Sequence, residues 1–318
     1  PTLSSAASDV YKRQALIGTV GMWSVVVFIP DIEKEFGLDR GTSSLLYAFT
    51  MIGFGFGTVV IGKVYDKFGI KKPILLATFV LITSYYFYSI FPFYWQFLIL
   101  QFFMGFAASA FFGPAMADIS NFFNKQRGFA LSIVASANYV AGATWPLLIG
   151  YFLTFIDWRA AHFWISICLF IMIPLILLLK NASVDESKSH DMKQRYKDIR
   201  LDLSNNQIQV LLMLAGICCC VAMAMPQVHM VALCVDNGFG LQVGTEILAV
   251  MLYSGMISRI VFGMISDRIG PVLTLLLGSF LQMVSLTFFL PFSSEISLYV
   301  VSLMLSLIHI SEPTRQPN

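Results

Sequence analysis

Arg259 stands inside a long apolar stretch of the sequence, eight residues before Asp267. On a helix, this separation places the guanidinium about 12 Å from the aspartate along the axis. A guanidinium grips a carboxylate through two parallel hydrogen bonds, so a substrate carboxylate would stabilise Arg259 at that depth. The alternative is that the long side chain reaches the nearest aqueous boundary and binds no substrate.

A second group of ionisable residues follows Pro226. His229 and Asp236 lie seven residues apart, which places them on one face of a helix. An imidazole titrates near neutral pH, so we interpret His229 and Asp236 as candidates for proton coupling. A packed or interfacial histidine would leave the same pattern, and that alternative stays open.

The composition places these residues in a membrane. The chain has 318 residues, of which 57% are hydrophobic and only 12% are charged, and its mean hydropathy is +0.76. Apolar stretches of about 20 residues, the length that crosses a hydrocarbon core, recur along the chain. We therefore expect an all-α polytopic membrane protein. The five cysteines lie in apolar stretches and are interpreted as small packing residues.

The apolar stretches predict a series of helices. They are expected at about residues 15–30, 44–64, 73–91, 95–121, 128–155, 160–180, 207–233, 241–264 and 271–291, with a tenth beginning near residue 296. We divide the chain into a probable non-native end (1–14), a six-helix half (15–180), a polar cytoplasmic linker (181–206), an incomplete second half (207–305) and another probable non-native end (306–318).

Lysine and arginine decide the expected orientation. They gather after the second, fourth and sixth helices, where residues 63–72, 125–127 and 188–200 are rich in basic side chains. Basic loops stay in the cytoplasm, so these loops and the N-terminus are expected inside. We expect a multi-pass protein of an inner or plasma membrane.

One loop motif occurs at the same place in each half. It reads Gly62-Lys-Val-Tyr-Asp-Lys-Phe-Gly69-Ile-Lys-Lys in the first half and Gly263-Met-Ile-Ser-Asp-Arg-Ile-Gly270 in the second. A glycine, an acid and a neighbouring base at fixed spacing indicate a charged turn at an aqueous boundary. Two copies indicate a duplicated bundle.

This loop resembles the signature loop of the major facilitator superfamily, and the resemblance runs over residues 15–305. The segments 122–130, 157–160, 226–231 and 258–263 are similar to the monocarboxylate transporters and the related bacterial oxalate/formate antiporters. The resemblance implies a twelve-helix bundle, of which about nine complete transmembrane helices plus partial ends are expected here. Two positions depart from known patterns: Gln101 replaces the arginine of proton-driven drug exporters, and Gly255 replaces an aspartate of eukaryotic monocarboxylate carriers.

The resemblance also implies a function, secondary active transport of a small organic anion by alternating access. The anion would move with a proton or in exchange for a counter-anion. An amide such as that of Asn138 would lack partners against lipid, which favours a place in a cavity. The expected substrate-binding residues are Arg259, Asn138, Tyr139, Trp145 and Tyr47. The expected gating residues are Gly62, Asp66, Lys67, Gly69, Lys71, Asp118, Arg127, Gly263, Asp267 and Arg268, unless these are ordinary solvated loops.

Two other functions stay open. A transporter of neutral or drug-like solutes would not need Arg259. A non-transporting membrane receptor or assembly factor would move no solute at all. The sequence shows no pattern of an enzyme, of a metal or cofactor site, or of nucleic-acid binding, so the expected partners are a small organic anion, a proton or counter-anion, and the lipid bilayer.

Overall fold

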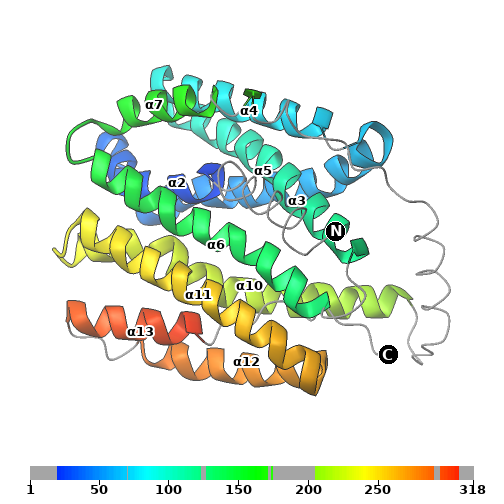
Figure 1. Cartoon of the computed structure of the whole chain (residues 1–318). Coiled ribbons are helices and arrows are strands. Elements are labelled where there is room, and N and C mark those ends of the chain that lie inside the picture. Colours follow the sequence, from blue (N-terminus) through cyan, green and yellow to red (C-terminus); the bar gives the residue numbers. More distant parts are fainter. Residues whose placement is uncertain are drawn as a thin grey trace.

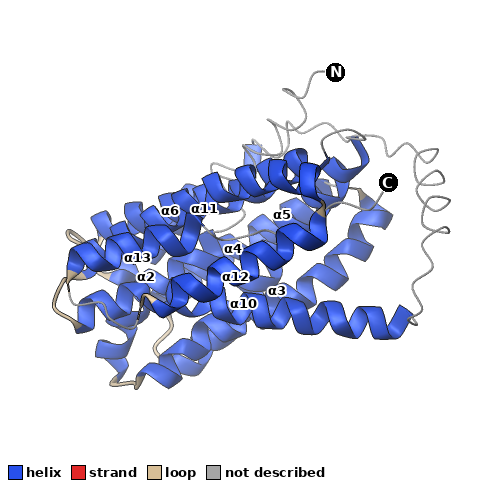
Figure 2. Ribbon diagram, turned by 90° about the horizontal axis from the view of Figure 1, so that it is seen from below, coloured by secondary structure: helices blue, strands red, loops and turns tan. Residues whose placement is uncertain are grey.

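The computed structural model describes residues 20–69, 71–122, 127–170, 173–174, 205–289 and 294–307. The expected ends at 1–14 and 306–318 lie outside these ranges, apart from residues 306 and 307. The expected linker at 181–206 also lies outside them, apart from its last two residues. The described residues form helices joined by short loops, and no strand occurs among them (Figure 2).

The helices of the first half are α2 (Val20–Phe36), α3 (Arg40–Phe68), α4 (Lys71–Ile90), α5 (Tyr94–Phe122), α6 (Arg127–Phe152) and α7 (Trp158–Phe170). Those of the second half are α10 (Asn205–Asp236), α11 (Leu241–Ile269), α12 (Pro271–Thr287) and α13 (Glu295–Leu307). Each expected helix overlaps one helix of this series, and the expected boundaries at 15, 180 and 291 lie outside the described residues.

Helices from the two halves pack against each other along their length. In the first half α3 packs on α5, and α4 packs on both α5 and α7. In the second half α11 packs on α10 and α13. The halves meet where α6 lies along α11 and where α2 contacts α10 (Figure 1). A site between the halves is therefore built from α2, α6, α10 and α11.

Four of the described helices are long and apolar enough to cross a membrane, over Arg40–Tyr65, Lys72–Ile90, Tyr94–Phe111 and Leu241–Ser266. Large apolar side chains on their outer surface, such as Phe56, Val59 and Phe79, are exposed in the isolated chain. Lipid tails would cover such side chains, which suits a membrane bundle. The count of nine complete spans stays a prediction.

The repeated motif lies at the ends of helices rather than in free loops, which corrects the expectation from the sequence. Helix α3 continues to Phe68 and α11 to Ile269, so the acid and base of each copy belong to the last turn. Lys67 and Arg268 are well placed there, because a cation is stabilised near a helix C-terminus. Lys67 and Arg268 are exposed in the last turns of α3 and α11, so these charged residues reach water without interrupting the helices.

Both copies of the motif end the helix with the same backbone device. Gly69 has φ 72° and its N–H donates to the Tyr65 carbonyl at 2.9 Å. Gly270 has φ 89° and its N–H donates to the Ser266 carbonyl at 3.1 Å. Glycine adopts positive φ without steric cost, so it is the residue that can stop both helices in this way. The duplication inferred from sequence is therefore visible in the backbone.

Glycines bring α3 and α5 into backbone contact. A Cβ on Gly53 would lie 1.9 Å from the Phe102 carbonyl oxygen, and one on Gly57 would lie 2.6 Å from the Phe106 carbonyl oxygen. From the other side, a Cβ on Gly105 would lie 1.9 Å from the Thr50 carbonyl oxygen. Small residues allow this close approach in membrane bundles.

This crossing yields a prediction about stability. Gly53→Ala forces the two backbones apart, and overpacking of this kind costs about 1 to 3 kcal/mol of unfolding free energy. We expect a lower thermal midpoint for the detergent-solubilised protein. Gly55→Ala is the matched control, since no atom lies within 4 Å of a Cβ at Gly55 on the same helix. Equal midpoints for both variants would contradict the packing argument.

Candidate functional site

Arg259 of α11 is held by Tyr139 of α6. Its Nη2 donates to the Tyr139 hydroxyl at 3.0 Å, and its guanidinium carbon lies 4.3 Å from the centroid of the Tyr139 ring. The hydroxyl in turn donates to the sulfur of Met223 on α10 at 3.4 Å. Three helices from both halves therefore fix the position of the guanidinium.

Gly255 makes room for this arrangement. A Cβ at Gly255 would lie 2.8 Å from the Tyr139 ring, so any larger side chain would displace the ring. Gly255 is one turn before Arg259 on α11, at the position where eukaryotic monocarboxylate carriers are expected to have an aspartate. In this chain the partner of the arginine at this point is an aromatic ring rather than a carboxylate.

Some buried polar atoms on α2, α6 and α11 have no partner among the described residues. In the described part of the chain, Arg259 Nε, Asn138 Oδ1 and Trp23 Nε1 are buried and have no hydrogen-bond partner. Asn138 precedes Tyr139 on α6 and lies one turn before Gly142, where a Cβ would be 2.6 Å from Trp23 Nε1. Leaving such groups unpaired costs free energy, so they indicate the position of a bound polar molecule or water.

The structure thus brings together two of the five expected substrate-binding residues, Arg259 and Tyr139. Asn138 is the residue before Tyr139 on α6, and its role in a site stays a prediction. Trp145 lies two turns after Asn138 on the same face of α6, and it is half-buried against the hydrophobic core. Tyr47 of α3 is also half-buried against that core. Both belong to the packed wall of the bundle.

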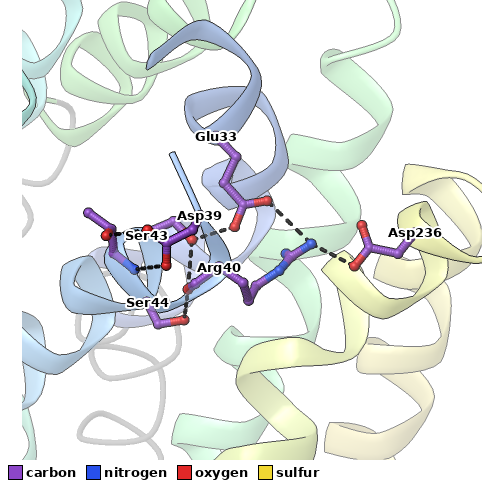
Figure 3. Close-up of polar contacts among 7 residues, drawn as sticks. Glu33, Asp39, Arg40, Ser43, Ser44 and Asp236 are labelled. Atoms are coloured by element: carbon purple, nitrogen blue, oxygen red, sulfur yellow. Dashed lines mark hydrogen bonds and ion pairs between the residues drawn. The ribbon is translucent and has the colours of Figure 1, made fainter. Parts of the chain in front are cut away.

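A second polar cluster lies at the end of the bundle where α2 turns into α3, which we call the Arg40 end (Figure 3). Arg40 Nη2 lies 2.7 Å from Asp236 Oδ2 and 3.3 Å from Glu33 Oε2. The Ser43 hydroxyl donates to the other oxygen of Glu33. One guanidinium therefore binds carboxylates from α2 and α10, and so from both halves.

Asp39 caps α3 beside this cluster. Its carboxylate accepts from the Thr42 backbone N–H at 3.0 Å and from the Thr42 hydroxyl at 2.6 Å. Both hydrogen bonds stabilise the charged carboxylate, and the one from the Thr42 hydroxyl has the larger effect. They therefore lower the pKa of Asp39 below its ordinary value of 3.8. The cap fixes the start of α3, and with it the position of Arg40 as the first residue of the helix.

Another ion pair at the same end stays within the first half. Arg159 Nη2 lies 2.6 Å from Glu35 Oε1, and the Trp158 indole N–H donates to Glu35 Oε2 at 2.7 Å. The same guanidinium stacks 4.4 Å from the Trp158 ring centroid. This pair joins α2 to the start of α7.

The expected coupling residues lie near the Arg40 cluster. Asp236, the last residue of α10, is the carboxylate that Arg40 binds, and His229 is half-buried two turns earlier on the same helix. Sequence reasoning did not single out Arg40 and Glu33. The signal that could have marked them is their position on either side of residues 37–39: Glu33 lies in the last turn of α2, and Arg40 begins α3.

Several expected gating residues cannot be placed. The side chains of Asp66, Lys71, Asp118, Arg127 and Asp267 lie outside the described part of the structure. Lys67 is exposed, and its ammonium lies 5.4 Å from the Phe68 ring centroid. Arg268 is exposed, Gly62 is half-buried and Gly263 is buried. The gating role expected for these residues stays a prediction.

Comparison with known proteins agrees with the expected fold. The family model described as "Major Facilitator Superfamily" matches residues 14–312. Similar curated proteins include "MFS-type transporter pynF" of Aspergillus niger, 27% identical over 67% of this chain and 49% of that protein. "Agnestins efflux protein AgnL12" of Paecilomyces divaricatus is 24% identical over 84% of this chain and 64% of that protein. The chain thus spans about half to two thirds of the length of these relatives.

The cap at Asp39 predicts how stability depends on pH. Because the folded-state pKa is lowered, the cap stabilises the fold above the ordinary pKa of 3.8, and this stabilisation is lost as pH falls through the folded-state pKa. We expect Asp39→Ala to lower the thermal midpoint at pH 7, with the gap to the parent closing in acid. Asp39→Asn keeps an acceptor but not the charge, so its midpoint at pH 7 should lie between those of the parent and Asp39→Ala. A gap that stays constant down to pH 2.5 would refute the assignment.

Proposed function

The chain belongs to the Major Facilitator Superfamily, and we propose that the protein is a secondary active transporter that moves a small organic anion by alternating access. Family and relatives alike indicate a multi-pass membrane transporter and not an enzyme. The monocarboxylate and oxalate/formate branch, with a proton or counter-anion as the second partner, is the finer part of the proposal.

The placement of Arg259 is the observation that supports an anionic cargo. Its guanidinium lies between the halves, and none of the ion pairs among the described residues involves it. Keeping a cation inside a membrane bundle is costly unless a partner or water compensates it. Tyr139 supplies a neutral acceptor and a ring face, which leaves the charge available to a cargo carboxylate.

The neighbouring unpaired atoms favour a cargo with a second polar group. Trp23 Nε1 on α2 can donate and Asn138 Oδ1 on α6 can accept, and both atoms are buried without a partner among the described residues. A hydroxyl can satisfy both at once, because it accepts one hydrogen bond and donates another. A small carboxylate that also carries a hydroxyl would match all three groups.

A second candidate cargo is a larger organic molecule that is exported. Two similar proteins are named as efflux proteins, for agnestins and for fujikurins. A neutral or drug-like cargo of this kind would not depend on the charge of Arg259. Dependence on that charge therefore separates the two candidates.

Arg259→Lys tests the anionic cargo. Lysine keeps the charge but loses the planar fork, so we expect uptake of a radiolabelled monocarboxylate into proteoliposomes to fall at least tenfold. Arg159→Lys makes the same change at the Arg40 end, on a different helix from Arg259, and should retain most of the uptake. Equal uptake by Arg259→Lys and the parent, at equal membrane insertion, would rule out the anionic cargo.

His229→Gln tests coupling to protons. If the imidazole relays the proton, the parent's uptake should change with pH near neutrality, and the variant's profile should be flat over that range. Glutamine keeps a polar side chain of similar size without a titratable group. Superimposable pH profiles for the variant and the parent would exclude His229 from coupling.

A further inference from the structure

We propose that the Arg40–Asp236 ion pair is a reversible latch that holds the two halves together at the Arg40 end. This inference rests on the proposed alternating access, because only a protein whose halves separate needs such a latch. The expected topology, with the N-terminus inside, places this end on the outer side of the membrane. None of the residues expected to act as gates from the sequence lies in this cluster.

The pair joins elements that belong to different halves. Arg40 is the first residue of α3, and Asp236 is the last residue of α10. Arg40 Nη2 and Asp236 Oδ2 lie 2.7 Å apart although the two residues are 196 positions apart in sequence. Among the described residues, the other inter-helix ion pairs, Arg40–Glu33 and Arg159–Glu35, stay within the first half. Separation of the halves at this end must break the pair with Asp236.

The first half holds Arg40 rigidly in place. Asp39 caps α3, and Glu33 binds the same guanidinium nitrogen that Asp236 does. The Tyr94 hydroxyl of α5 donates to the carbonyl of Thr42, which fixes the first turn of α3 from another side. Arg40 is therefore presented to α10 as a fixed charge, and opening need not rearrange the first half.

The second half offers a partner that can leave. The side chain of Asp236 is 58% exposed, whereas that of Glu33 is only 14% exposed. After Asp236 the chain turns at Gly238 and Gly240, both with positive φ. When the pair breaks, water can solvate Asp236 at once while Glu33 still neutralises Arg40. A partly exposed pair contributes modestly to stability, which suits a contact that forms and breaks in every cycle.

Distances between spin labels at this end test the latch. Lys34 of α2 and Gln242 of α11 are exposed and lie in different halves, so they can be replaced by cysteine after the five native cysteines are changed to serine. In liposomes, we expect Asp236→Asn to increase the population with long label distances about two- to fivefold, the factor that a partly exposed ion pair supplies. Arg40→Gln should act in the same direction.

Two controls make the test specific. Glu35→Gln breaks the ion pair with Arg159, which has similar length but lies within one half, and it should leave the distances unchanged. The double variant Arg40→Gln/Asp236→Asn should shift the population no further than Asp236→Asn alone, because both changes break the same contact between the halves, the Arg40–Asp236 pair. An unchanged distribution in Asp236→Asn, an equal shift in Glu35→Gln, or additive shifts in the double variant would each overturn the latch.

The readout also separates the latch from the transport proposal. Arg259→Lys should abolish uptake while the label distances at the Arg40 end stay those of the parent. Intact anion uptake together with unchanged distances in Asp236→Asn would refute the latch alone. If no population with long label distances occurs under any condition, in the parent or in any variant, alternating access itself is refuted.

Discussion

The absence of water inside a bilayer governs this structure, because every polar group within the bundle must find its partner in the protein. The first half meets this requirement with short internal contacts. Gln101 accepts from Thr50 at 2.8 Å and donates to the Tyr88 hydroxyl at 3.3 Å. Ser24 and Tyr85 bind each other through their hydroxyls at 2.6 Å. Unpaired buried polar atoms remain among the described residues of α2, α6 and α11, and others lie at Arg40 and on α12 and α13.

The same requirement explains the role of the small residues. Close packing must replace the hydrophobic effect between helices that already lie in an apolar solvent. Gly53 and Gly105 let α3 and α5 touch backbone to backbone. At the junction of the halves, Gly142 and Gly255 instead accommodate the rings of Trp23 and Tyr139. Glycine tightens one interface and shapes a site at the other.

Much of this architecture follows from the sequence alone. Apolar stretches gave the helices, and the repeated glycine motif gave the duplication, because both signals are local. The helix starts were less accurate: the polar run after Asp39 read as loop, but the cap and the packing of Tyr94 extend α3 to Arg40. The Arg259–Tyr139 contact and the Arg40–Asp236 pair depend on which helices become neighbours. That information lies in tertiary packing, so Arg259 was singled out from sequence and Arg40 was not.

Arg259 and its aromatic partner come from helices of different halves, α11 and α6, and this origin has a thermodynamic consequence. If the halves move relative to each other as proposed, the distance between the guanidinium and the Tyr139 ring changes, and the affinity of a site at this place changes with it. By linkage, any molecule that binds there shifts the balance between the two arrangements by the difference in its two binding free energies. A tight ligand with equal affinity for both arrangements would leave that balance where it was.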